Sequence, residues 1–261
     1  LSSFFFLLFN FKVSFKNMYF YCTLGVATHC LLDACTTYGT SLLLPFANDR
    51  FAWNIISIID PIFTLILLTC IIFLFYKKSL FHVRLGFVLS LIYIFLGYQK
   101  NLQVQSYITK ISEIRGHNIE RLMVNPTIGN IILWRTVYEY NDKYYVDAIY
   151  FPYFSNPKIK KGHTLNVIDK EKIFPELGND SRQRKDIRRF SYFTNDYIYI
   201  HPDNKFLIAD LRYGTLPHDI QSLWGIEIDP KNLNNYVHFK NLRNFNNEIY
   251  SEFWEMLKGN F

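Results

Sequence analysis

The chain has 261 residues, of which 50% are hydrophobic and 18% are aromatic, and its formal net charge is +6. The first 98 residues hold six basic and three acidic residues and the remainder is nearly balanced, so no concentrated basic surface that would bind nucleic acid is expected. All four cysteines lie in apolar segments and the polar half has none, so no disulfide framework is expected. No pair of them has the spacing of a zinc ribbon.

Apolar segments dominate the first 98 residues and lie at residues 1–9, 18–36, 55–76 and 85–98. The first segment begins at Leu1 without Met, so we expect the natural N-terminus to lie further upstream. Segments 18–36 and 55–76 approach the ~20 residues with which a helix crosses a bilayer, and 85–98 is short but can be extended through Phe81 and Val83. The sequence therefore predicts an α-helical polytopic membrane domain over residues 1–98, followed by a small α+β extramembrane domain over residues 99–261.

Basic residues between these segments predict the orientation. Residues 10–17 and 77–84 are both basic, and the positive-inside rule places such loops in the cytoplasm. The loop over residues 37–54 and the extramembrane domain would then lie on the other face. In a bacterial inner membrane that face is the periplasm.

The extramembrane domain opens with an amphipathic helix. Val104, Ile108, Ile111 and Ile114 recur at helical spacing over residues 99–115, and Gly116 is expected to end this helix. Downstream, the patterns predict a hairpin of residues 130–140 and 143–151, a hairpin of 197–200 and 206–211, a strand over 223–228 and a closing helix over 245–257. Between the hairpins, a basic helix is expected over 180–190, with Asp180 or Ser181 as its cap and Arg184 on a solvated face. Residues 152–179 read as a loop.

The candidate site begins with His29 and Asp33, which lie four residues apart in an apolar helix. Side chains at this spacing share one helix face. Ionisable groups at membrane depth are costly and mark functional sites. An imidazole and a carboxylate suit a divalent ion such as Zn²⁺ or Mn²⁺, which would activate water for hydrolysis. The alternative is a hydrogen-bonded pair that only fixes helix packing.

Two further residues join the candidate site from the following loop and helix. Asp60 precedes Pro61 at a helix start, so it is predicted either to cap that helix or to serve as a third metal ligand or general base. Arg50 lies in the polar loop, and its guanidinium suits a phosphate or carboxylate. The alternative for Arg50 is a solvated loop charge.

Several stretches resemble one bacterial family. After His29 and Asp33 come TTYGT, LLLPF, NDRFAW and IIDPIFTL, and later Pro126-Thr127, Asn130 and Leu133-Trp134-Arg135. In this order they resemble the LexA-binding, inner-membrane-associated, metal-dependent hydrolases, the YdjM-like family. The resemblance implies a multi-pass membrane hydrolase with a metal site. Members also carry an N-terminal segment with further His and Asp motifs, which is absent here, so the chain resembles an N-terminally truncated member.

Two functions follow from these observations. The first is an integral inner-membrane metal-dependent hydrolase in which His29, Asp33 and Asp60 bind the ion and Asp60 and Arg50 are catalytic, with a lipid-linked or envelope phosphoester as substrate. The second is a non-catalytic, membrane-anchored envelope protein whose soluble domain binds a partner. In both, the lipid bilayer is a partner and nucleic acid is not.

Overall fold

The computed structural model describes residues 14–77 and 80–261. By its internal contacts the chain divides into two compact units, which are Leu1–Tyr98 with Ile128–Asn130, and Gln99–Thr127 with Ile131–Phe261. The short apolar helix expected over residues 1–9 lies outside the described residues, as do Lys12 and Lys78 of the expected basic loops.

The helices that begin in the first unit are α2 (Phe15–Cys35), α3 (Pro61–Lys77) and α4 (Leu80–Ile114). Helix α3 begins later than expected because its start is set by Pro61, whose missing N–H is tolerated at a first helical position. The residues before Pro61 bond to the end of α2 instead of joining α3. The backbone N–H groups of Ile55 and Ile56 donate to the carbonyl oxygen of Cys35, at 2.8 and 3.1 Å.

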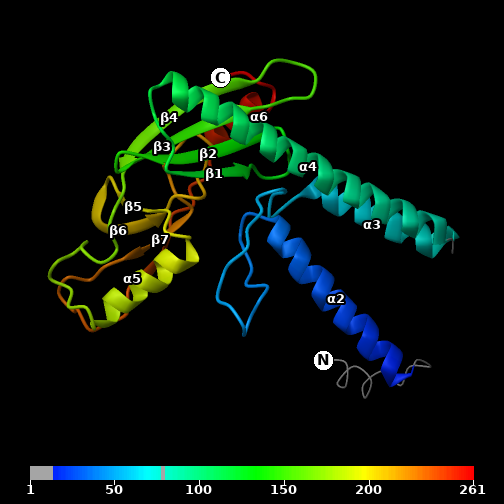
Figure 1. The fold of residues 1–261 in the computed structure, drawn as a ribbon, viewed down its shortest axis with the longest axis horizontal. Coiled ribbons are helices and arrows are strands. Elements are labelled where there is room, and N and C mark those ends of the chain that lie inside the picture. Colours follow the sequence, from blue (N-terminus) through cyan, green and yellow to red (C-terminus); the bar gives the residue numbers. More distant parts are fainter. Residues whose placement is uncertain (1–13, 78–79) are drawn as a thin grey trace. The chain divides into compact units, whose positions relative to one another are not determined.

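The prediction of an α-helical polytopic membrane domain is wrong. Within residues 14–77 and 80–261, α4, with 35 residues, is the one helix that is both long and apolar enough to cross a membrane. Helix α3 has 17 residues, and α2, although 21 residues long, carries Lys16, His29 and Asp33. The described chain instead combines helices with two antiparallel β-sheets (Figure 1).

Helices α3 and α4 expose much of their apolar surface. Large apolar side chains that are more than a third exposed include Leu65, Leu68, Ile71, Leu85, Phe87, Leu91, Ile92 and Phe95. A core helix of a soluble protein buries such side chains, and contiguous apolar surface of this kind marks contact with lipid or with another protein. Helices α3 and α4 therefore expose apolar area that is costly to leave in contact with water.

The second unit holds two four-stranded meanders. The first has the order β1 (Arg121–Pro126), β2 (Leu133–Tyr140), β3 (Lys143–Tyr150) and β4 (Lys158–Asn166). The predicted β2–β3 hairpin is confirmed, and its turn residues Asn141 and Asp142 both have positive φ, as a tight type I′ turn requires. Strand β1 was not predicted, and the expectation of a loop over residues 152–179 is wrong where β4 pairs with β3. Helix α4 ends at Ile114, and Gly116 follows with φ +75°, which confirms the expected stop.

The second sheet has the order β5 (Ile198–His201), β6 (Asn204–Asp210), β7 (Trp224–Glu227) and β8 (His238–Asn241). Helix α5 (Arg182–Phe193) is capped by Ser181, one of the two expected caps, and packs Ile187 against Ile208 of this sheet. Helix α6 (Asn247–Leu257) packs Met256 against Leu133 of the first sheet. Each helix of the second unit therefore covers apolar residues of one sheet.

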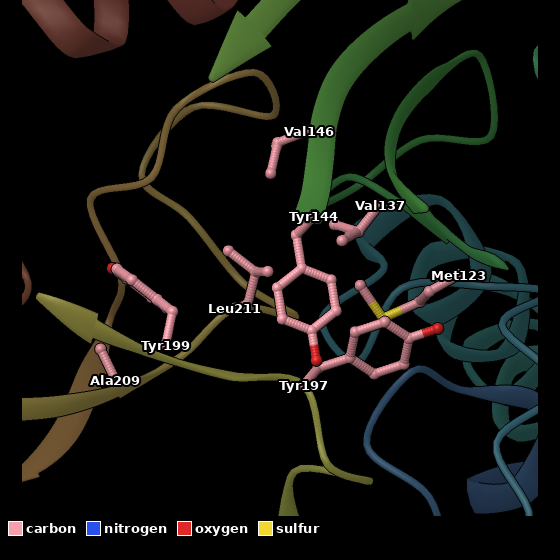
Figure 2. Close-up of a cluster of buried hydrophobic side chains, with 8 residues drawn as sticks. All are labelled: Met123, Val137, Tyr144, Val146, Tyr197, Tyr199, Ala209 and Leu211. Carbon is pink, nitrogen blue, oxygen red and sulfur yellow. The ribbon is translucent and has the colours of Figure 1, made fainter. Parts of the chain in front are cut away.

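A shared core joins the two sheets (Figure 2). Met123, Val137 and Val146 are register partners on three neighbouring strands, so their side chains share one face of the first sheet. Tyr199 of β5 and Ala209 of β6 join them, together with the residues that flank these strands, Tyr197 and Leu211. The Tyr144 ring lies 5.9 Å from that of Tyr197, and its hydroxyl donates to the carbonyl oxygen of Asp196 at 3.0 Å. Burial raises the pKa of Tyr144, so this hydroxyl stays protonated.

This core predicts a large cost for removing one of its side chains. Leu211 is fully buried in the cluster, so Leu211→Ala should lower the free energy of unfolding of the second unit by about 2–5 kcal/mol. The measurement is urea unfolding of the full chain, followed by tryptophan fluorescence. Phe239→Ala, on the exposed strand β8, is the matched control and should change stability little. Equal costs for the two variants would contradict a core between the sheets.

Candidate functional site

His29 and Asp33 lie side by side on α2, as their spacing predicts. The Nε2 atom of His29 is 3.5 Å from an Asp33 carboxylate oxygen, and the two side chains are 72% and 48% exposed. Both residues therefore keep polar atoms at the surface of the first unit. An imidazole and a carboxylate are two of the side-chain types that bind divalent metal ions.

Asp60 is held by two hydrogen bonds on opposite sides of its carboxylate. One oxygen accepts from the backbone N–H of Phe63 at 3.0 Å, and the other accepts from the hydroxyl of Tyr93 in α4 at 2.8 Å. The first bond is an N-cap, made three residues into α3. The second ties the start of α3 to α4. Asp60 is only 5% exposed, so this carboxylate is buried and satisfied by its neighbours.

Arg50 fastens its own loop. One guanidinium nitrogen donates to the carbonyl oxygens of Tyr38 and Gly39, at 2.9 and 3.0 Å, and the guanidinium lies 5.8 Å from the centre of the Tyr38 ring. The same loop is closed by a backbone bridge between Thr40 and Phe51. These contacts hold the loop between α2 and α3 in shape.

The structure does not bring the predicted ligands together as a set of three. Within the described ranges, no three His, Cys, Asp or Glu side chains are grouped so that they could hold a metal ion. His29 and Asp33 alone fall one donor short of the three protein ligands of a typical catalytic zinc site. Metal binding by His29, Asp33 and Asp60, and catalysis by Asp60 and Arg50, stay predictions.

A second polar cluster, in the second unit, was not predicted. Arg115, just after α4, places a guanidinium nitrogen 2.5 Å from Asp147 of β3 and 3.1 Å from the Tyr138 hydroxyl of β2. His117 Nδ1 lies 2.8 Å from the same hydroxyl, and its ring stacks on Tyr140 at 4.7 Å. The four polar residues come from three elements, so no local spacing could reveal them.

Electrostatics in this second cluster favour a structural role. Burial by itself lowers the pKa of Arg115, but hydrogen bonds to Asp147 and Tyr138 outweigh it and the pKa is raised. Burial, together with the charges of Arg115 and Lys161, lowers the pKa of His117. At neutral pH the cluster thus holds a fixed ion pair beside a neutral imidazole, which fastens the end of α4 to the sheet.

The bonds of Asp60 predict a measurable coupling with Tyr93. Asp60→Ala should cost about 0.5–2 kcal/mol for the lost cap alone. Tyr93→Phe should cost less, about 0.5–1.5 kcal/mol for one hydrogen bond. The double variant should cost less than the sum, because both changes remove the same bond between α3 and α4. Thermal unfolding in lipid vesicles measures all three, and exposed Asp49→Ala is the control. An unfolding temperature unchanged or raised by Asp60→Ala would contradict the capping role.

Comparisons with known proteins give one similarity, which covers the first part of the chain. Neither a curated protein nor a solved structure matches it. A family model does match, and its description names neither a hydrolase nor binding to LexA, so those features of the earlier resemblance stay predictions. Residues 1–103, which include the apolar segments and all four candidate site residues, are similar to the family described as YdjM inner membrane protein.

Proposed function

We propose that this protein is a non-catalytic membrane-anchored protein of the inner membrane, in which α4 crosses the bilayer once and carries a β-sheet unit that binds a partner. The observation that carries the proposal is the change of environment along α4. Before Tyr98 most of its large apolar side chains are exposed, among them Phe87 and Leu91. Beyond it, Val104 and Ile108 are fully buried in the second unit.

This change suits a helix that passes from lipid into a folded domain. Lipid would cover the apolar side chains of residues 85–98, whereas the side chains of residues 99–114 alternate between packing and solvent. The match of residues 1–103 to a family of inner membrane proteins supports the same location. Both carboxylate oxygens of Asp60 already accept a hydrogen bond, from Phe63 and from Tyr93. This arrangement favours a packing role for Asp60 over a catalytic one.

The proposal includes an orientation. Lys77 and Arg84 precede the apolar run of α4, and the positive-inside rule assigns such a flank to the cytoplasm. The second unit would then lie on the periplasmic face.

Charges placed in the apolar run should release the chain from the membrane. Leu91 and Ile92 lie at the centre of the run and are half exposed. Each arginine there costs about 2.5–3.5 kcal/mol on insertion scales. We therefore expect wild type to stay in the membrane pellet after alkaline carbonate extraction and the double variant Leu91→Arg/Ile92→Arg to appear in the supernatant.

The matched control for this experiment lies on the same helix. Ser106→Arg adds a charge at an exposed position beyond the apolar run and should leave the chain in the pellet. Release of wild type by carbonate, or equal behaviour of the two arginine variants, would contradict anchoring through α4. Protease added to intact spheroplasts reports the orientation, since it should degrade the second unit only if that unit is periplasmic.

The exposed His29–Asp33 pair favours a second candidate, a metal-dependent hydrolase acting on a lipid-linked phosphoester. This candidate predicts about one Zn²⁺ or Mn²⁺ per purified full chain, a stoichiometry expected of one ligand set. The metal should be lost in both His29→Ala and Asp33→Ala and kept in the control Asp49→Ala. Elemental analysis of the purified protein measures it. A wild type without stoichiometric metal would rule the candidate out.

A further inference from the structure

The loop between β3 and β4 carries two adjacent exposed aromatic side chains. It comprises residues 151–157, Phe-Pro-Tyr-Phe-Ser-Asn-Pro. Tyr153 is 47% exposed and Phe154 is 101% exposed, so the Phe154 ring contacts almost nothing else in the protein. Apolar side chains scattered singly on a surface need no explanation, but an aromatic pair at the tip of a loop is a common contact element.

This loop is fastened to α4 at one particular place. The ammonium group of Lys100 donates to the carbonyl oxygen of Pro152 at 3.0 Å and lies 4.0 Å from the centre of the Tyr153 ring. About two helical turns further along, Tyr107 packs edge-on against Phe151, with ring centres 5.8 Å apart. The attachment lies within the second unit and involves the first two turns of its share of α4.

The position of Lys100 along α4 determines where the loop lies relative to the end of the apolar run. Lys100 follows the last residue of the apolar run, Tyr98, by two positions, which is about 3 Å along a helix axis. If α4 leaves the bilayer where its apolar run ends, Lys100 lies at the level of the lipid headgroups. A loop bound to Lys100 then lies at that level too.

We propose that residues 151–157 form an interfacial anchor, with Tyr153 and Phe154 inserted into the headgroup region of the bilayer beside the end of the α4 span. The inference rests on the proposed function, because it requires α4 to cross the membrane. Aromatic side chains concentrate at the membrane–water interface, where an apolar ring can be buried while polar atoms stay wet.

The charges around the loop fit a lipid surface. No acidic residue occurs between Asp147 and Asp169, so nothing in the loop repels anionic headgroups. Lys100 itself is 4% exposed, and its ammonium group lies over the Phe151 and Tyr153 rings, at 4.8 and 4.0 Å from their centres. Lys100 therefore fastens the loop to α4 and leaves the exposed Phe154 ring free to enter the interface. The anchor would fix the second unit against the membrane surface and so limit how that unit can tilt about α4.

The test uses one fluorescent label at a time on the full chain in lipid vesicles. The four native cysteines are replaced, and an environment-sensitive dye is attached at Phe154→Cys, Phe87→Cys or Asp203→Cys. Phe87 lies in the apolar run and is exposed, so it reports whether α4 is in lipid. The Asp203 side chain is 92% exposed in the β5–β6 turn and serves as the matched control in water. Lipids that carry a quencher near the headgroup or deep in the acyl chains are added in turn.

The expected result is loss of fluorescence at Phe87→Cys with the deep quencher, loss at Phe154→Cys with the shallow quencher, and no loss at Asp203→Cys. Loss at Phe87→Cys without loss at Phe154→Cys overturns the interfacial anchor and leaves the α4 span intact. No loss at Phe87→Cys overturns both.

A second measurement leaves the native cysteines in place. Benzoylphenylalanine is incorporated at position 154 and irradiated in native membranes, and the masses of the cross-linked adducts are measured by mass spectrometry. Lipid adducts support the anchor, whereas adducts only to protein would assign the loop to a protein partner and overturn it.

Discussion

The structure depends on one constraint, the abrupt change of surroundings along α4. A helix of 35 residues is apolar and exposed in its first half and packed against a sheet in its second half. Such a helix can be stable only if lipid or protein covers the first half, because exposed apolar area of this size is costly in water. The unit boundary at Tyr98 and Gln99 falls at the same point. The proposed anchoring by α4 and the proposed interfacial position of the aromatic loop both rest on this change.

The buried polar groups of the described chain mostly fasten elements together. Asp60 joins the start of α3 to α4, and Asp147 holds Arg115 at the end of α4. Arg135 of β2 is 4% exposed and donates to the carbonyl oxygens of Leu211, Leu216, Pro217 and Asp219. Burial lowers its pKa to about 10, so it stays charged at neutral pH. A buried charge that is satisfied by carbonyl oxygens fixes a connection rather than a reaction.

Local chemistry made part of this fold predictable from sequence. Asn141 and Asp142 marked a tight turn, Ser181 a helix start and Gly116 a helix stop, because each residue acts through its own backbone conformation. Strands β4 and β8 could not be predicted, since their residues are largely polar and exposed and become strands only through pairing with β3 and β7. Arg184, expected on a solvated helix face, is buried against the carbonyl oxygens of Lys170 and Phe174. Such contacts depend on tertiary packing.

The candidate site shows the same limit. Spacing on one helix correctly placed His29 beside Asp33, but no pattern could say that Tyr93, more than thirty residues from Asp60, occupies one of its oxygens. Apolar run length likewise overstated the number of spans, because it could not locate where α3 begins.

Spin-label scanning of α4 in lipid vesicles measures whether the first half of this helix lies in lipid. Nitroxide side chains placed one at a time over residues 85–112 report collisions with oxygen, which concentrates in lipid, and with a water-soluble nickel complex. If α4 spans the membrane, oxygen accessibility should be high and nickel accessibility low at most positions up to Tyr98. Beyond it, a helical period should follow, in which Val104 and Ile108 are shielded from both reagents. Oxygen accessibility no higher before Tyr98 than at exposed positions after it would contradict a membrane-spanning α4.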